Sequence, residues 1–299
     1  MSDDGQRPPM LGVIGGSGVY DITGLEQARW EQVETPFGDP SDHILVGELE
    51  GLPVAFLPRH GRGHPLPPSG VNYRANIDAL KRLGVTDVLS LSAVGSLREE
   101  LAPGTFVLVD QFIDRTIERD KSFFGPGLVA HVSMAEPVCN RLADLVERVA
   151  VEEELPVRRG GTYLAMEGPQ FSSRAESEMY RAWGCDVVGM TNMPEAKLAR
   201  EAELCYATVA MVTDFDCWHP DHGNVEVADV IRVLQANASK ARSLVEAVAE
   251  SFGHRPDPCP QGCDRVLDTA LITMPQARDP ERLRCLDAVA GRVLTNDTE

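Results

Sequence analysis

The chain has 299 residues, of which 28 are Lys or Arg and 46 are Asp or Glu, so its formal net charge is −18. This length can bury the core of one large α/β domain or of two smaller ones, and no change of composition divides the chain before about Phe252, so we expect one domain. The acidic balance argues against a nucleic acid or an anionic membrane as partner, and a small anion would need a local basic pocket.

The N-terminal segment and the cysteines indicate a cytoplasmic protein. Residues 1–9, MSDDGQRPP, are expected to form a disordered tail, and the apolar run of about five residues after them is too short for export or a membrane span. The cysteine count, seven, is odd, and several cysteines lie in apolar runs, where a reduced thiol behaves as a small hydrophobe. Cys259 and Cys263 could bridge each other or help bind a metal, but no matching set of His and Cys accompanies them, so no metal site is predicted.

A short strand, residues 11–14, is expected to lead into the glycine-rich turn GGSG at 15–18. Glycines there let backbone N–H groups converge on an anion, and Ser17 adds a hydroxyl. The segment does not match GxGxxG and no GK[ST] follows, so the dinucleotide and P-loop hypotheses are weak, and a plain turn is an alternative of equal weight.

A predicted hairpin, with strands at 43–49 and 52–57, leads to the loop PRHGRGHPLPP at 58–68. The loop gathers Arg59, His60, Arg62 and His64 in an otherwise acidic chain. Such a cluster is costly unless it holds an anion, and the planar fork of arginine suits phosphate. A solvated basic loop is the alternative.

Strand and helix patterns alternate through the middle of the chain. Helices are expected at 71–83, 137–155 and 173–183, the last with the capping box Ser173 and Glu176, and Asn192 and Glu195 could cap a further helix. Strands are expected at 85–91, 105–114, 162–166 and 185–190, the first ending in the small polar run that begins with Ser92 and Ala93. The alternation predicts an α/β fold of three layers, a central mixed sheet with helices on both faces.

The stretch CYATVAMVTDFDCW, at 205–218, carries the strongest chemical signal. Its uncharged first part is typical of a strand covered on both faces. Because side chains alternate along a strand, Asp214 and Asp216 are expected on one face about 6.6 Å apart. Neighbouring carboxyl groups resist double ionisation and burial adds to that cost, so one should keep its proton above the usual pKa of ~3.9.

A protonated carboxyl beside an ionised one complements the N7 acceptor and the N6 amino donor of adenine. A proton given to N7 also improves the purine as a leaving group, which is general acid catalysis at a glycosidic bond. A 6-oxopurine offers two acceptors on that edge and would prefer an amide. From these residues alone, acids that only cap the next turn are an equal alternative.

A long amphipathic helix is expected at about 225–252, with Val227, Val230 and Ile231 on its apolar face. A proline-rich linker and a last helix, at 279–294, follow. We therefore divide the chain into the tail, a domain at 10–253 and a C-terminal extension at 254–299 whose helix packs on the same domain.

Many segments together resemble the trimeric purine nucleoside phosphorylases. They are GGSG at 15–18, ETPFGDPSD at 34–42, RHGRGH at 59–64, AVGSLREE at 93–100, DQFIDRT at 110–116, MAEP at 134–137, EGPQFSSRAES at 167–177, GMTNMPEAKLAREA at 189–202 and TDFDCW at 213–218. The last resembles the members that act on 5'-methylthioadenosine. The resemblance covers about residues 11–252 and implies cleavage of an N-glycosidic bond by inorganic phosphate as co-substrate, in a homotrimer, without organic cofactor or metal.

The resemblance also implies roles for individual residues. Phosphate would be held by Ser17, Arg59, His60, Ser92, Ala93 and Thr191. Met190 would lie against the ribose, Phe171 against the base and Ser172 beside the base edge. Asp214 would serve N7 and Asp216 the exocyclic amine, Val227, Val230 and Ile231 would bury the methylthio group, and His131 of a neighbouring subunit would close the site.

Three positions depart from the family pattern: Gly189 replaces Asn, Gln170 replaces Arg and Ser17 replaces Thr. Gly189 could loosen support of the base edge, so a phosphorylase of methylthioinosine, inosine or adenosine is the alternative activity. A nucleosidase, indifferent to phosphate, and a non-catalytic nucleoside-binding regulator are further hypotheses. A serine hydrolase is weaker, because Ser17 lacks the GxSxG frame.

Overall fold

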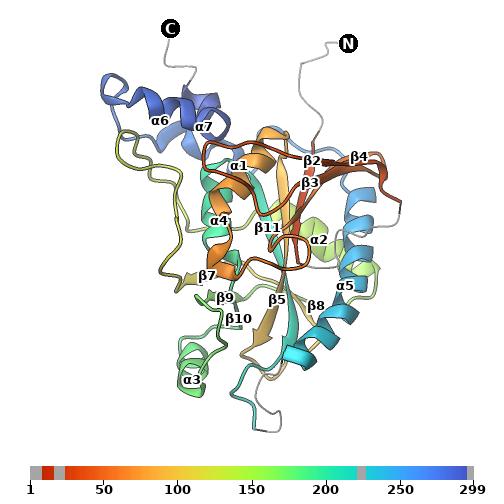
Figure 1. The fold of residues 1–299 in the computed structure, drawn as a ribbon. Coiled ribbons are helices and arrows are strands. Elements are labelled where there is room, and N and C mark those ends of the chain that lie inside the picture. Colours follow the sequence, from red (N-terminus) through yellow and green to blue (C-terminus); the bar gives the residue numbers. More distant parts are fainter. Residues whose placement is uncertain (1–8, 17–23, 221–226, 295–299) are drawn as a thin grey trace.

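The computed structural model describes residues 9–16, 24–220 and 227–294 (Figure 1). Their strands form one eleven-stranded mixed sheet. The strands are β1 (Leu11–Gly15), β2 (Glu26–Glu31), β3 (Ile44–Leu49), β4 (Leu52–Pro58), β5 (Asp87–Ser96), β6 (Phe106–Leu108), β7 (Gln111–Asp114), β8 (Val157–Arg159), β9 (Thr162–Ala165), β10 (Val187–Gly189) and β11 (Cys205–Asp214). The helices are α1 (Tyr73–Arg82), α2 (Asn140–Glu152), α3 (Arg174–Ala182), α4 (Asn192–Glu201), α5 (Val227–Glu250), α6 (Pro280–Cys285) and α7 (Asp287–Leu294).

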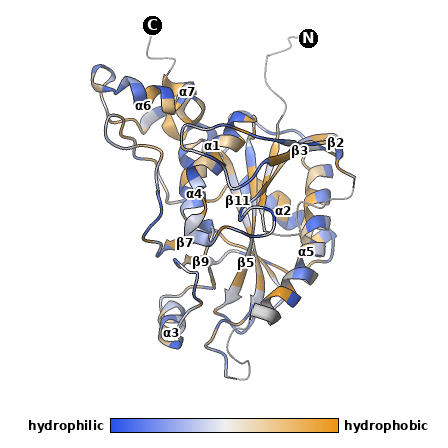
Figure 2. Ribbon diagram, in the orientation of Figure 1, coloured by the Kyte–Doolittle hydropathy of each residue, from blue (hydrophilic) through white to orange (hydrophobic). Residues whose placement is uncertain are grey.

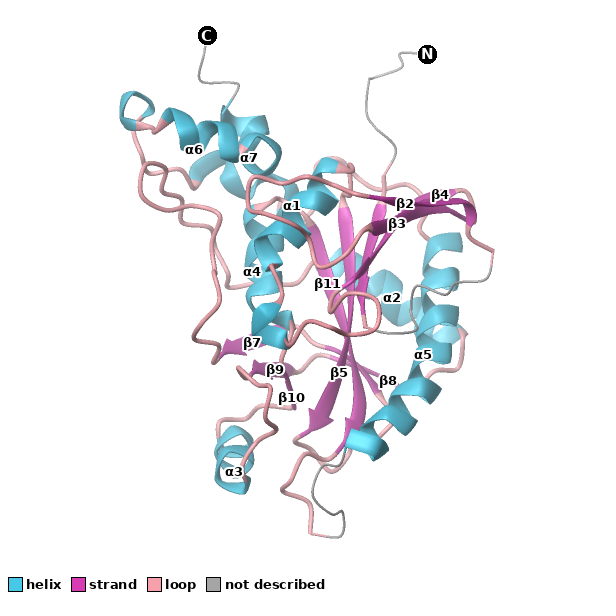
Figure 3. Cartoon of the chain, in the orientation of Figure 1, coloured by secondary structure: helices cyan, strands magenta, loops and turns pink. Residues whose placement is uncertain are grey.

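Strand β5 is the centre of the sheet. It pairs in parallel with β1 and with β11, and its last residues pair antiparallel with β10. From β1 the sheet continues through β4 and β3 to β2, from β10 through β9 to β7, and β6 and β8 lie beyond β11. The predicted mixed sheet is confirmed, and its two long parallel strands, β5 and β11, end beside each other, as ligand sites of α/β proteins require (Figure 3).

Helices cover both faces of the sheet. Helices α1 and α4 pack together on one side, and α2 and α5 pack together on the other (Figure 1). Alternate residues of β11 face these two layers: Tyr206 and Val212 belong to one core, and Val209 and Met211 to the other. Burial on both faces explains the uncharged sequence of β11, and the apolar helix faces turn inward accordingly (Figure 2).

The elements differ from the sequence pattern in several places. The single strand expected at 105–114 is wrong: the chain forms β6, which pairs with β11, and then β7, which pairs with β9. Strand β2 has no apolar alternation because it is an exposed edge strand. Asn192 does not cap α4; Thr191 holds the cap position, and the Asn192 amide donates to Ser90 and Tyr206.

The C-terminal segment packs on the side of α1 and α4. Its expected helix is divided into α6 and α7, which meet at Leu286. Asp287 pairs with Arg82 of α1, and Arg292 pairs with the buried Glu203, which also accepts from the backbone of Leu267. In the part of the chain that the structure describes, no helix combines the length and the apolar character that crossing a membrane requires.

Candidate active site

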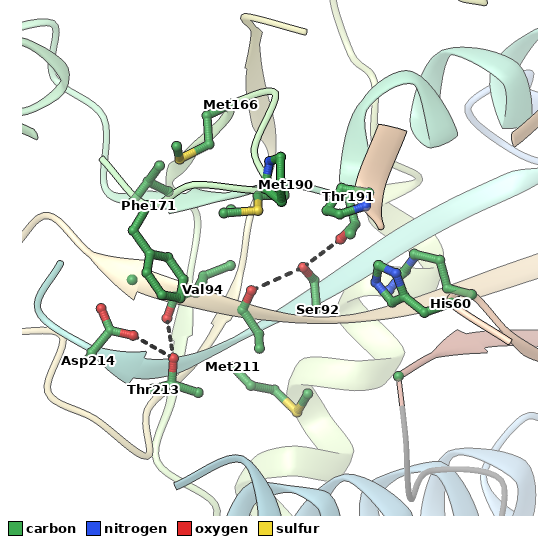
Figure 4. Close-up of a pocket in the computed structure, with 18 of the residues that line it drawn as sticks. His60, Ser92, Val94, Met166, Phe171, Met190, Thr191, Met211, Thr213 and Asp214 are labelled. Carbon is green, nitrogen blue, oxygen red and sulfur yellow. Dashed lines mark hydrogen bonds between the residues drawn. The ribbon is translucent and has the colours of Figure 1, made fainter. Parts of the chain in front are cut away.

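A cavity of about 600 Å³ lies at the C-terminal ends of β5 and β11 (Figure 4). Loops after β4, β9 and β10 complete its wall. It is lined by Gly16, Arg59, His60, His64, Pro65, Pro67, Pro68, Leu91, Ser92, Ala93, Val94, Gly95, Met166, Pro169, Phe171, Ser172, Val188, Gly189, Met190, Thr191, Met211, Thr213, Asp214, Asp216 and Ala238. The lining divides into a polar end, an apolar middle and an acidic end.

Hydroxyl groups and an imidazole form the polar end. The hydroxyl of Ser92 lies 3.0 Å from that of Thr191 and 3.2 Å from that of Tyr163. Ala93 follows Ser92 along β5, and His60 faces the pair from the loop after β4 (Figure 4). Such a concentration of donors at a buried site suits an oxyanion.

Arg59 is fully buried behind this end and has a counter-ion. Its Nε donates to Glu195 at 2.8 Å, its Nη2 donates to Glu195 and to Ser90, and its Nη1 donates to the carbonyl of Leu91. The sequence analysis treated Glu195 only as a helix cap, and that interpretation was wrong. Glu195 instead neutralises the guanidinium, so the pair adds hydrogen-bonding groups to the polar end without a net charge.

His60 is a neutral ring. Burial, and then the charge of Arg59, lowers the pKa of His60 to about 4. Its Nδ1 lies 2.9 Å from the carbonyl of Leu66, and because a carbonyl only accepts, Nδ1 carries the proton and Nε2 keeps a lone pair. The ring stacks on His64 with centroids 4.2 Å apart, which fixes its plane.

Asp214 and Asp216 form the acidic end, but a tight turn rather than a strand brings them together. β11 ends at Asp214, and Asp216 adopts a left-handed backbone with φ 51°. The N–H of Asp216 donates to Oδ1 of Asp214 at 2.7 Å, while Oδ2 of Asp214 accepts from the hydroxyl of Thr213 at 2.7 Å. The expectation of alternation along an extended chain was therefore wrong, although both acids line one cavity.

Burial changes the acid–base behaviour of both groups. It raises the pKa of Asp214, against the hydrogen bond from Thr213. It also raises the pKa of Asp216, to which the neighbouring Asp214 adds. Asp216 is 5% exposed, and the neighbouring hydroxyls of Ser177 and Ser172 partly offset the effect of burial on its pKa, although its Oδ2 has no hydrogen-bond partner of normal geometry among the described residues. A buried acceptor of this kind costs free energy until a donor arrives, so Asp216 is ready for a ligand N–H.

Apolar side chains separate the two ends. Met190 and Met166 lie on one side of the cavity, Val94 and Met211 on another, and Phe171 stands over Asp214 (Figure 4). Ser172 is beside Phe171 in the wall, with its hydroxyl on the sulfur of Met166. A flat aromatic ring fits between such surfaces by dispersion and stacking.

The remaining predicted residues are not part of the lining as described. Ser17 and the side chains of Val227 and Val230 fall outside the described residues. Ile231 is 46% exposed and is not part of the lining. His131 lies in a second cavity, of about 380 Å³, together with Lys121, Lys197 and Glu201.

Tyr163 is a functional candidate that the sequence analysis missed. It lies within the apolar pattern of β9, and its hydroxyl contacts both Ser92 and the backbone N–H of Thr191. A Cβ at Gly189 would meet that hydroxyl at 2.0 Å. Gly189, which departs from the family pattern, therefore makes room for the hydroxyl of Tyr163. The glycine at this position was the one signal in the sequence that could have pointed to Tyr163.

The fold and the paired ends of the cavity define a class of nucleoside-cleaving enzyme, and comparisons agree. Residues 10–250 match the model of the phosphorylase superfamily, and the chain belongs to it. Within that superfamily it belongs with the S-methyl-5'-thioadenosine phosphorylases. The enzyme of that name from Rhodospirillum rubrum is 69% identical over 96% of this chain and 98% of its own length, and that of Cereibacter sphaeroides is 65% identical over 95% and 98%.

Solved structures support the same assignment. A methylthioadenosine phosphorylase from an antarctic soil metagenomic library has a TM-score of 0.88 at 48% identity, covering 95% of this chain and 99% of its own. The Schistosoma mansoni methylthioadenosine phosphorylase in complex with adenine has a TM-score of 0.83 at 38% identity, covering 88% and 98%.

Proposed function

We propose that this protein catalyses the reversible phosphorolysis of 5'-methylthioadenosine to adenine and 5-methylthioribose 1-phosphate. One observation carries the proposal: a single cavity has two buried carboxyl groups at one end and a cluster of oxyanion-binding groups at the other. The separation of these ends by an apolar wall matches a purine, a sugar and a phosphate in line. Membership of the family supports the substrate.

The acidic end recognises and activates the base. Protonated Asp214 donates to N7 of adenine, and Oδ2 of Asp216 accepts from the exocyclic amine. As the C1'–N9 bond breaks, the electron pair moves into the purine and the proton of Asp214 neutralises it. Phe171 and Met190 hold the ring and the ribose so that little motion is needed before reaction.

The polar end holds the nucleophile. Ser92, Thr191 and the backbone at Ala93 donate to the phosphate oxygens, with Ser17 of the glycine-rich turn as a further donor. Arg59 and His60 line this end from the same loop. One phosphate oxygen forms the new bond to C1' as the positive charge on the ribosyl group develops, so positioning and charge complementarity supply most of the acceleration.

The 5' group and the assembly belong to the same proposal. Val227 and Val230, at the start of α5, are proposed to bury the methylthio group, where a 5'-hydroxyl would lack a partner, whereas the exposed Ile231 is left out of this pocket. His131 stands away from the cavity of its own chain, which supports a role in the site of a neighbour within a homotrimer. The seven unbridged cysteines support the cytoplasm as its location.

The test is an assay of adenine release from methylthioadenosine with and without phosphate, with adenosine and inosine as parallel substrates. Release that depends on phosphate and is fastest with methylthioadenosine supports the proposal. A rate indifferent to phosphate would identify a nucleosidase, and faster cleavage of inosine would identify a 6-oxopurine phosphorylase. Binding of methylthioadenosine without turnover would identify a regulator.

A further inference from the structure

Four cysteine side chains from separate parts of the chain meet in the interior. They are Cys139 at the start of α2, Cys205 at the start of β11, and Cys259 and Cys263 in the segment that follows α5. Each is at most 2% exposed. The sequence analysis predicted no metal site because Cys259 and Cys263 had no matching partners nearby, and the fold supplies Cys139 and Cys205 from distant parts of the chain.

The sulfur atoms have the spacing of a metal coordination sphere. All four Sγ atoms lie within 4.8 Å of one another, and those of Cys139 and Cys259 are 3.8 Å apart. A tetrahedron of sulfurs around zinc, with Zn–S bonds of about 2.3 Å, has edges of about 3.8 Å. A disulfide would need about 2.05 Å between two of them. The cluster therefore has the dimensions of four ligands around one ion.

We propose that Cys139, Cys205, Cys259 and Cys263 bind one zinc ion as a structural site. Binding converts four thiols and Zn²⁺ into a tetrathiolate complex of charge −2 and releases four protons. Four protein sulfurs complete the tetrahedral shell, which leaves no position for a water or a substrate. The site is thus structural, and the cleavage chemistry at the other end of β11 proceeds without it.

Neighbouring groups hold the ligands in place. Arg255 donates to Sγ of Cys205 at 3.6 Å and is itself fixed by Asp87 and Asp264. The carboxylate of Asp264 also accepts from the backbone N–H of Cys259, which closes the short loop CPQGC. Gly262 turns that loop with φ 64°, so both of its cysteines face the same point. A positive charge beside the sulfurs and fixed surroundings are what thiolate ligands require.

The experiment measures metal in the full-length chain, expressed with a tag that carries no histidine and purified under reducing conditions. Elemental analysis is expected to give one zinc per chain that survives dialysis against a chelator. A mercurial thiol reagent should release the zinc, followed with a colorimetric zinc indicator. Exchange with Co²⁺ should give the intense sulfur-to-cobalt charge-transfer absorption and visible bands of tetrahedral thiolate coordination.

Matched variants assign the ligands. Cys139→Ser is expected to lose the zinc and the cobalt spectrum, whereas Cys285→Ser, which changes a cysteine outside the cluster, should keep both. If Cys139→Ser does not fold, the zinc content and the cobalt spectrum of the unaltered chain still decide the matter. The proposal is overturned if the reduced chain contains no zinc and takes up none when Zn²⁺ is added. It is equally overturned if mass spectrometry of the unreduced chain shows the loss of four hydrogens, which would mean that the four cysteines form two disulfide bonds.

Discussion

Replacing Asp214 by Asn tests the assignment of the proton donor most directly. The exchange preserves the fold around the turn, because the amide oxygen can still accept from the N–H of Asp216. The amide nitrogen can donate to the hydroxyl of Thr213, which keeps its own proton for the carbonyl of Val94, 3.2 Å away. The substitution therefore removes the acid proton while leaving both local hydrogen bonds possible.

The expected loss follows from the role of a general acid. Such a group contributes about 10²–10⁴ in rate, or about 3 to 5 kcal/mol of transition-state stabilisation. We expect kcat/KM for methylthioadenosine to fall by that factor. The fall for methylthioinosine should be smaller, because N7 and O6 of a 6-oxopurine are both acceptors and an amide at position 214 can donate to them. Steady-state assays at saturating phosphate measure both.

The pH dependence of kcat/KM tests the role of Asp214 as a general acid independently of the size of the rate loss. Burial raises the pKa of Asp214, and the acid acts only while protonated. For the unaltered chain kcat/KM should therefore decline as pH rises through that elevated pKa, and Asp214→Asn should lack this limb. Asp144→Asn, a surface change in α2, serves as the matched control. Equal losses on the two nucleosides, or an unchanged rate on methylthioadenosine, would refute the assignment.

Three further substitutions probe two groups at the site, Glu195 and Tyr163, and one in the second cavity, Glu201. Glu195→Gln leaves Arg59 buried without its counter-ion, which should cost about 3 to 5 kcal/mol of stability. Phosphate should then raise the melting temperature of this variant more than that of the unaltered chain. An equal rise in the two proteins contradicts the proposed role of the Arg59–Glu195 pair. Tyr163→Phe removes the partner of Ser92 and Thr191, so the KM for phosphate should rise roughly tenfold with little change for the nucleoside; the reverse pattern argues against a phosphate role. Burial raises the pKa of Glu201 to about 7, so its stabilising contribution is complete below about pH 4.5 and is lost as pH rises through 7. The free energy of unfolding of Glu201→Gln, measured in urea, should therefore exceed that of the unaltered chain by up to about 3 kcal/mol at pH 8 but not at pH 4.5. A difference between the two proteins that does not vary with pH shows that ionisation of Glu201 is not the cause.

Local patterns in the sequence were sufficient for the layers, whereas most of the residues expected at the cavity came from the resemblance to the phosphorylases. The uncharged run of β11 indicated burial on two faces, and the Ser173 and Glu176 pair forms the capping box that its spacing predicts. Both signals depend on neighbours in the sequence. The expected strand at 105–114 is divided into β6 and β7 because the first part pairs with β11 and the second with β9. These partners lie far along the chain, so no local sequence pattern predicts the division.

The site residues that were missed share one property: their partners lie far away along the chain. Glu195 meets Arg59 across 136 residues, and Cys139 meets Cys259 across 120. A helix-cap pattern already accounted for Glu195, so nothing in the sequence indicated that it pairs with Arg59. Only the packing of α4 against β5 and β11 brings its carboxylate to the guanidinium.

The neutral imidazole of His60 has a consequence for which anions can enter. A lone pair on Nε2 attracts an oxyanion that carries a hydroxyl and repels one that does not. Hydrogen phosphate and hydrogen arsenate retain such a proton near neutrality, whereas sulfate, of similar size and charge, is fully ionised. At the proposed phosphate site we therefore expect hydrogen phosphate and hydrogen arsenate to bind more tightly than sulfate.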